Sequence, residues 1–149
     1  MSHSSPIYIC FMDASKAFDK VNHWILFKKL LDRGLPKFVV RLLSSWYSSQ
    51  KFYIKWLNRL SPGFHVSNGV RQGGIMSPIL FNLYVDELSN ALTNTRVGCC
   101  IGSVFTNHLL YADDSVILAP SPYALQVLLN VCETFADSCD MVYNVKKQY

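Results

Sequence analysis

The feature that most constrains this chain is a pair of adjacent aspartates, Asp113 and Asp114, between two short apolar runs at 109–111 and 116–118. Both runs have the composition of β-strands, so the sequence predicts a hairpin. Adjacent residues of a regular strand point to opposite faces of a sheet. The two carboxylates can therefore reach one site only at a tight turn, where this alternation breaks and aspartate is common. An isolated Asp-Asp pair is more often a plain turn than a metal site, so other residues are needed to show whether this pair binds a metal.

Composition and charge limit the classes of protein that fit. The 149 residues are 50% apolar, which is enough for a single domain with a substantial core. Residues 1–75 contain 11 Lys and Arg against 3 Asp and Glu, whereas residues 76–149 contain 3 against 7. A basic half beside a carboxylate pair favours metal chemistry on a phosphate polymer. The alternative is that these basic residues only solvate the exposed faces of helices.

Cysteine usage and hydropathy indicate the compartment. The five cysteines contain no Cys-x-x-Cys pair and are odd in number, which argues against a disulfide framework or a zinc cluster. The N-terminus lacks the features of a signal peptide, and no apolar run approaches the roughly 18 residues of a membrane span. We therefore expect an intracellular protein, nuclear or cytoplasmic, without a membrane partner. Strand-like runs close to both ends, at 7–12 and 141–145, indicate a piece of a larger protein.

Hydrophobic periodicity predicts the other elements. The continuously apolar run at 7–12 predicts a buried strand that ends in Asp13. His65 lies in a predicted strand pair and is interpreted as a surface residue, because no partner is evident that would fix its protonation state. The remaining predicted elements are, in order, a helix from about Trp24 to Gly34, a helix from Leu35 to about Ser48, a strand pair at 52–56 and 63–67, short β-structure at 97–105, a helix from about 122 to 136, and a strand at 141–145.

A glycine-containing loop at 68–74 leads into a predicted helix. Ser77 suits the N-cap and Pro78 the first helical position. Asn82 and Asp86, four residues apart, share one face of that helix. A helix N-terminus after a glycine loop favours an anion. An ordinary loop and helix would show the same pattern. This segment therefore indicates a functional site only when it is considered together with the aspartates.

The order of elements predicts an antiparallel sheet with helices packed on one face, in the α+β class. Such a sheet could bring Asp13 beside Asp113 and Asp114. Three carboxylates at one edge repel one another unless cations neutralise them, and oxygen ligands with room for substrate phosphates favour Mg²⁺ over zinc. Two such ions could activate an attacking 3′-hydroxyl and stabilise the leaving pyrophosphate. The sequence therefore predicts nucleotidyl transfer.

Four segments, in this order along the chain, resemble the reverse transcriptases of non-LTR (LINE-like) retrotransposons and, more distantly, those of group II introns and telomerase. The segments are 11–21 (FMDASKAFDKV), 68–82 (NGVRQGGIMSPILFN), 111–114 (YADD) and 139–147 (CDMVYNVKK). The resemblance covers essentially the whole chain. It implies that residues 1–149 are a polymerase palm with part of the fingers, and that the N-terminal fingers and the thumb are absent.

The resemblance assigns the catalytic groups. Asp13, Asp113 and Asp114 would be catalytic ligands of two Mg²⁺ ions, which Mn²⁺ could replace, with Asp113 as the main ligand of the pair. Lys147 would protonate the leaving pyrophosphate. The segment that holds Lys147 departs from the family pattern at Asp140-Met141 and at Gln148.

The resemblance also assigns the nucleotide site. Phe18 would be the steric gate that rejects a 2′-hydroxyl, the group that distinguishes ribonucleotides. Gln72 and Gly73 would contact the pair formed by template and dNTP, and Asn82 would support the nucleotide from the helix. The implied partners are an RNA template, a DNA primer, dNTPs and the rest of a parent polyprotein, with its fingers, thumb and an optional endonuclease.

The sequence thus predicts the catalytic palm of an RNA-directed DNA polymerase, in a chain that we expect to be too short to polymerise alone. Two alternatives stay open. One is the palm of an RNA-templated RNA polymerase, for which Phe18 is the discriminating residue. The other is a non-catalytic, nucleic-acid-binding remnant of a retroelement.

Overall fold

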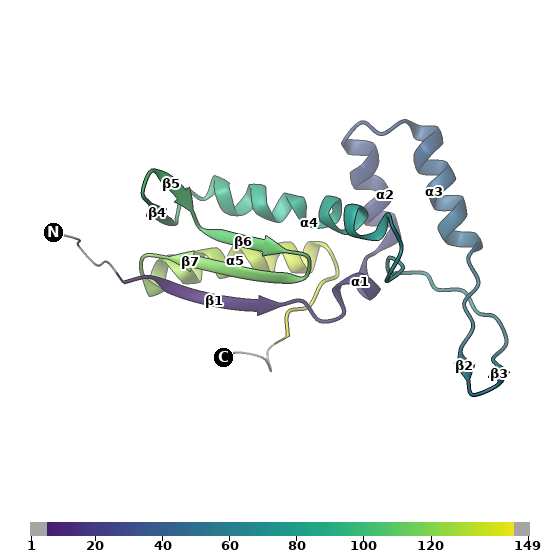
Figure 1. The fold of residues 1–149 in the computed structure, drawn as a ribbon. Helices are drawn as coiled ribbons and strands as arrows, with labels where there is room; N and C mark the ends of the chain where they lie inside the picture. Colours follow the sequence, from purple (N-terminus) through teal and green to yellow (C-terminus); the bar gives the residue numbers. More distant parts are fainter. Residues whose placement is uncertain (1–5, 145–149) are drawn as a thin grey trace.

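The structure is a computed structural model that describes residues 6–144 (Figure 1). Its centre is a three-stranded antiparallel sheet in the order β1-β7-β6, made of β1 (Tyr8–Asp13), β7 (Asp114–Ala119) and β6 (His108–Tyr111). The turn between β6 and β7 consists of Ala112 and Asp113, and Ala112 has a φ of 52°. The hairpin predicted at the two aspartates is confirmed, and so is a strand that ends in Asp13. The predicted burial of that strand was wrong, because β1 lies at an edge of the sheet and Ile9 and Phe11 are more than half exposed.

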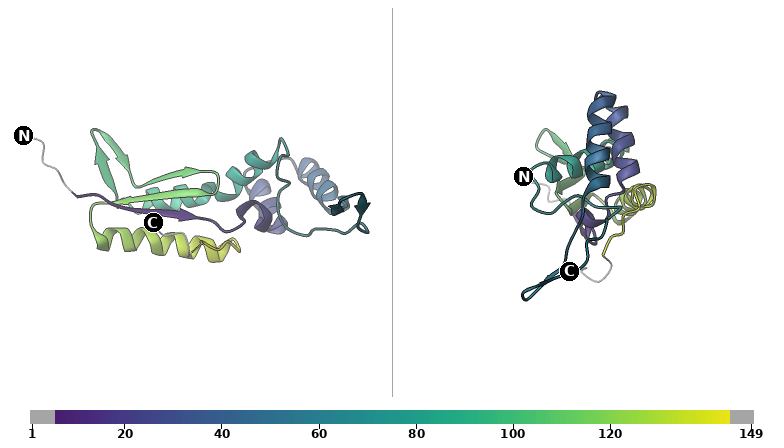
Figure 2. Two further views of the ribbon diagram at one scale, coloured as in Figure 1. Left: turned by 60° about the horizontal axis from the view of Figure 1, so that its bottom comes forward. Right: turned by 90° about the vertical axis from the view of Figure 1, so that its right-hand side faces the viewer.

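Two long helices cover one face of this sheet. α5 (Pro122–Ser138) packs on β7 and β1, while α4 (Ser77–Asn94) packs on β6 and on α5 (Figure 2). Side chains alternate between the two faces of a strand. Ile117 of β7 is accordingly fully buried under the helices, whereas Phe11 of β1 is 59% exposed on the other face. The α+β architecture with helices on one face is as predicted.

Three further helices lie beyond one end of the sheet: α1 (Ala17–Lys20), α2 (His23–Asp32) and α3 (Lys37–Ser49) (Figure 1). Asn22 caps α2, since its side-chain oxygen accepts hydrogen bonds from the amides of Trp24 and Ile25. α2 packs against both α3 and α4. None of the helices within residues 6–144 combines the length and the apolar character needed to cross a membrane.

The segment after α3 projects away from the body (Figure 1), and we call residues 52–66 the arm. The predicted pairing of 52–56 with 63–67 is reduced to a single bridge between Phe52 and Phe64, and two short strands, β2 (Lys55–Trp56) and β3 (Arg59–Leu60), close the arm nearer its tip. The β-structure predicted at 97–105 is a hairpin of β4 (Cys99–Ile101) and β5 (Val104–Thr106). Of the strand predicted at 141–145, the described part forms one bridge, from Tyr143 to Ala14.

The predicted N-cap of α4 was wrong by one residue. Met76 occupies the cap position without a side-chain hydrogen bond, and Ser77 is the first helical residue. The Ser77 hydroxyl is buried and donates to the carbonyl oxygen of Arg71 at 2.6 Å. The Gly74 amide donates to the same carbonyl oxygen of Arg71, and the turn closed by this hydrogen bond brings that oxygen to the Ser77 hydroxyl. Ser77 therefore closes the preceding loop instead of capping the helix.

A buried lysine joins three helices. Lys29 of α2 is only 7% exposed, and its Nζ donates to the carbonyl oxygen of Tyr84 at 2.8 Å. The same ammonium lies 2.8 Å from Glu87 and over the rings of Tyr84 and Phe135. The Tyr84 hydroxyl donates to the carbonyl oxygen of Cys139 at 2.6 Å, and burial raises the pKa of Tyr84 to about 12. This network fixes α2 and α4 to the end of α5.

We expect Lys29→Met to lower the free energy of unfolding by about 2 kcal/mol, because it removes a buried hydrogen bond from a charged group. Glu87→Gln is the matched control. The Glu87 side chain is 55% exposed, so the loss of its ion pair should cost less than about 1 kcal/mol. Urea unfolding followed by circular dichroism measures both values. Equal losses in the two variants, or a gain in stability for Lys29→Met, would contradict this account of the network.

Candidate active site

The three predicted metal ligands lie at one end of the sheet. Asp13 is the last residue of β1 and stands directly opposite Asp114, the first residue of β7. Side chains in such a pair share one face, with Cβ atoms about 5 Å apart. Asp113 lies in the adjoining turn, where its carbonyl oxygen accepts a hydrogen bond from the Ala14 amide at 3.3 Å. The fold thus brings Asp13 to the Asp-Asp turn, as predicted.

The donors fit a hard divalent cation in chemistry, because carboxylate oxygens are the ligands that Mg²⁺ prefers. Within residues 6–144, however, no three His, Cys, Asp or Glu side chains already form a group that could hold a metal. Three carboxylates at one edge repel one another in the absence of a neutralising charge. The structure therefore places the aspartates side by side, but it does not arrange them as a complete set of metal ligands.

A cavity of about 430 Å³ adjoins Asp113, and we call it the Asp113 cavity. Its volume is within the range of small-molecule sites. It is lined by Phe18, Gln72, Gly73, Gly74, Ile75, Ser77, Pro78 and Asp113. Four predicted site residues, Asp113, Phe18, Gln72 and Gly73, thus meet around one space although they come from the hairpin turn, from α1 and from the loop before α4.

The ring of Phe18 is supported from below by α4. It stacks on the ring of Phe81, with 4.6 Å between centroids and 15° between planes. Phe81 is 1% exposed, so this support belongs to the core. Phe81 was not predicted as a site residue, since it lies on the apolar side of a helix, where an ordinary core residue is expected. Asn82, the next residue, is exposed on α4, and its support of a nucleotide stays a prediction.

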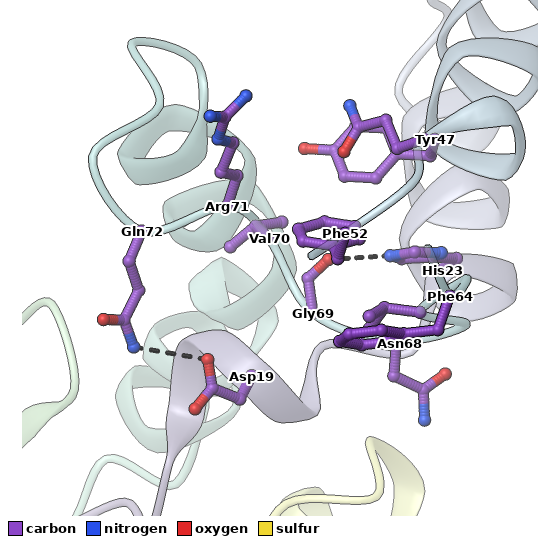
Figure 3. Close-up of a pocket in the computed structure, with 12 residues that line it drawn as sticks. Asp19, His23, Tyr47, Phe52, Phe64, Asn68, Gly69, Val70, Arg71 and Gln72 are labelled. Carbon is purple, nitrogen blue, oxygen red and sulfur yellow. Dashed lines mark hydrogen bonds between the residues drawn. The ribbon is translucent and has the colours of Figure 1, made fainter. Parts of the chain in front are cut away.

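The loop at 68–72 is bound along the backbone of α1 and the start of α2. The Val70 amide donates to the carbonyl oxygen of Phe18 at 2.8 Å, and the Gly69 amide donates to that of Val21 at 2.7 Å. Nε2 of His23 lies 2.7 Å from the carbonyl oxygen of Gly69 (Figure 3). A carbonyl oxygen only accepts, so His23 Nε2 carries the proton. His23 was missed because a lone histidine in a helical pattern gives no signal of a long-range partner.

The side chain of Gln72 is held by Asp19. Nε2 of Gln72 donates to Oδ1 of Asp19 at 3.2 Å (Figure 3). An ionised carboxylate only accepts hydrogen bonds, so the amide nitrogen must face Asp19 and Oε1 must point away from it. The orientation of the predicted contact residue is thus set by a neighbour that the sequence analysis did not single out. The remaining predicted residue, Lys147, lies outside the described part of the chain.

Several known proteins are similar to this chain over most of its length. Residues 1–148 match the family described as reverse transcriptase (RNA-dependent DNA polymerase). The chain is 34% identical over 145 residues to the Retrovirus-related Pol polyprotein from type-2 retrotransposable element R2DM of Drosophila melanogaster, which covers 97% of the chain and 14% of that protein. It is 28% identical over 144 residues to the RNA-directed DNA polymerase from mobile element jockey of Drosophila funebris, covering 93% and 15%.

Among solved structures, the fold resembles apo telomerase from Candida tropicalis truncated from its C-terminal domain. The TM-score is 0.73 at 15% sequence identity, and the match covers 96% of this chain and 30% of that one. At this identity the likeness shows the fold. The chain spans a small part of these relatives, whose sequences nevertheless align with nearly all of it. The resemblance to non-LTR retrotransposon enzymes is therefore confirmed, and the chain belongs to the reverse transcriptase (RNA-dependent DNA polymerase) family.

Proposed function

We propose that residues 1–149 are the catalytic palm, with part of the fingers, of an RNA-directed DNA polymerase, and that this palm transfers nucleotides from dNTPs to a primer 3′-hydroxyl on an RNA template. One observation carries the proposal. Asp113, Phe18, Gln72 and Gly73 surround a single cavity at the end of the sheet where Asp13 faces Asp114. A nucleotide bound there would have its phosphates beside the aspartates and its sugar beside Phe18.

Asp13 and Asp113 would hold two Mg²⁺ ions, with Asp114 in support, and Mn²⁺ could take their place. When bound, such ions lower the pKa of an attacking hydroxyl and stabilise the charge on a leaving pyrophosphate. The carboxylates themselves are brought together by the register of β1 against β7 and by the tight turn before β7. Their mutual repulsion makes the site dependent on a cation.

The other residues would select and orient substrates. Phe18, fixed by Phe81, would exclude a 2′-hydroxyl, and Gln72, fixed by Asp19, would contact the pair of template base and dNTP. Asn82 would support the nucleotide from α4. Lys147 would give a proton to the pyrophosphate. A DNA primer, an RNA template and the fingers and thumb of the parent polyprotein would complete the machinery, with or without an endonuclease.

Primer extension on an RNA template tests this function. The experiment compares this chain with a version extended at both ends by the neighbouring segments of its parent protein, each with dNTPs and with Mg²⁺, Mn²⁺ or a chelator. We expect metal-dependent DNA synthesis by the extended chain and much weaker or no synthesis by the 149 residues alone. Absence of metal-dependent nucleotide addition by a folded extended chain would overturn the proposal.

Phe18→Val should relax the choice of sugar. A smaller side chain leaves room for a 2′-hydroxyl, so we expect the kcat/KM ratio of UTP to dTTP to rise about 10-fold or more in the extended chain. Phe81→Leu, which removes the stacked support without removing the gate, should give a smaller rise. Steady-state kinetics with the two nucleotides measures both ratios. An unchanged ratio in Phe18→Val would show that Phe18 is not the gate.

A further inference from the structure

A second cavity, of about 480 Å³, lies against the loop that carries Gln72 (Figure 3). We call it the aromatic cavity, because four rings from three segments line it. They belong to His23, Tyr47, Phe52 and Phe64. Gln72 lines both this cavity and the Asp113 cavity, so the two spaces are neighbours. The reactions described above make no use of the aromatic cavity.

The two phenylalanine rings are held in place by the base of the arm. The amide of Phe52 donates to the carbonyl oxygen of Phe64 at 2.8 Å, and the reverse hydrogen bond is 3.0 Å long. The ring centroids are 6.4 Å apart. Tyr47 is buried near the end of α3 and packs edge-on against His23 at 4.9 Å. A flat apolar group could therefore stack on rings whose backbone positions are already fixed.

Among the residues that line this cavity Arg71 is basic, and the stretch of chain that supplies most of the lining is rich in basic residues. Between Asp32 and Asp86 the chain contains seven Lys and Arg residues and no Asp or Glu. This stretch includes α3, the arm and the loop, and Arg71 of the loop directs its guanidinium group outward at the rim of the cavity (Figure 3). The carboxylate that lines the cavity, that of Asp19, already accepts a hydrogen bond from Gln72. A ligand with an aromatic ring and a negative charge fits both features.

We propose that the aromatic cavity binds an unpaired nucleobase of a single nucleic-acid strand, stacked on Phe52 and Phe64, with the adjoining phosphate beside Arg71. Aromatic rings within a positively charged groove are the usual recognition surface for single strands, because every base has a stacking face and every linkage a phosphate. The proposal rests on the proposed function, since Gln72 places this cavity next to the copying site. The bound base would belong to the template strand, one step away from the base being copied.

Binding of a short RNA oligonucleotide that contains 2-aminopurine tests the proposal on this chain, without any need for catalysis. Stacking quenches the fluorescence of this base. Phe64→Leu should weaken binding about 10-fold and reduce the quenching, because base stacking contributes strongly to such complexes. The matched control is Phe105→Leu, the same substitution at a ring that is 41% exposed, against 42% for Phe64, in β5 at the other end of the molecule (Figure 1). The control should bind within about twofold of the original chain.

Arg71→Met gives a second, independent readout in case Phe64→Leu perturbs the arm. Removal of one phosphate contact should reduce the slope of log K against log salt by about 0.7, the value for a single strand. A DNA oligonucleotide of the same sequence should bind within about threefold of the RNA, because stacking and phosphate contacts do not read the 2′-hydroxyl. A tenfold preference for RNA would overturn this mode of recognition.

The outcomes separate the two proposals. If the extended chain does not synthesise DNA but binding still depends on Phe64, the proposed function fails and the cavity proposal stands. If DNA synthesis occurs but Phe64→Leu and Phe105→Leu bind and quench alike, and Arg71→Met leaves the salt slope unchanged, the cavity proposal is wrong. The cavity would then be a surface for another segment of polypeptide.

Discussion

Asp113→Asn is expected to reduce the kcat for nucleotide addition by an extended chain by about 10³-fold or more, a loss of the size seen when a central catalytic group is removed. The substitution keeps the shape of the side chain and removes its charge. Asp113 lines the same cavity as Phe18, Gln72 and Gly73, so the substitution removes an acidic group from the wall of the proposed nucleotide site. Weaker binding of Mg²⁺ should follow from the loss of an anionic oxygen ligand.

Asp86→Asn is the matched control for this prediction. Asp86 lies on α4, and its carboxylate forms an ion pair with Arg33 at 2.6 Å. The Asp86 side chain is 49% exposed. Loss of such a surface pair should leave kcat within about twofold and stability within about 1 kcal/mol. Single-turnover primer extension, with the Mg²⁺ concentration varied, measures kcat and metal dependence together. Retention of full activity by Asp113→Asn would show that the mechanism proposed for this cavity is wrong.

The parts of the fold that the sequence predicted are those with a strong local period. The apolar run before Asp13 and the two runs around Asp113 predicted the three strands of the main sheet, and the spacing of leucines predicted α4 and α5. The ends of the helices were predicted less well, because they depend on individual side-chain hydrogen bonds that hydrophobic periodicity does not encode. Ser77 is an example: its hydroxyl closes the loop on Arg71, and so the helix starts one residue earlier than a capping serine would allow.

The candidate site also contains residues that the sequence predicted and residues that it did not. Asp13, Phe18, Gln72 and Asp113 were predicted as site residues from motifs that resemble those of a known family, and the structure brings the last three of them to one cavity. The residues that hold them in position were not predicted. Phe81 and Asp19 act through contacts with partners 63 and 53 residues away, as the stack on Phe18 and the hydrogen bond from Gln72 show. Neither hydrophobic period nor spacing carries information on such pairs, and only the packing of α1, α4 and the loop reveals them.

The second large effect is expected at Gly69, where the loop crosses the backbone of α1. Gly69 has a φ of 92°, and a Cβ atom added there would lie 2.8 Å from the carbonyl oxygen of Asp19. That oxygen belongs to the backbone, so it cannot rotate away. Gly69→Ala must therefore push the loop off α1 and weaken the hydrogen bonds from Gly69 to Val21 and from Val70 to Phe18. We expect a loss in stability of about 3 kcal/mol or more.

Gly34→Ala separates strain from collision. Gly34 has a φ of 82°, nearly the same backbone conformation, but a Cβ atom there would meet nothing within 4 Å. Its substitution should therefore cost only the intrinsic penalty of a left-handed alanine, about 1–2 kcal/mol. Urea unfolding of both variants, on the chain as it stands, gives the difference that belongs to the contact with Asp19. Equal losses would mean that the loop is not held against α1.

The same pair of variants links this contact to substrate binding. Because the loop carries Gln72 and hydrogen-bonds the backbone of Phe18, its displacement should disturb both walls of the Asp113 cavity at once. In an extended chain we expect Gly69→Ala to raise the KM for dNTP about 10-fold, an effect typical of a misplaced positioning group, while Gly34→Ala leaves it within about twofold. Measured at a temperature where both variants are folded, an unchanged KM for Gly69→Ala would show that the loop does not set the position of Gln72.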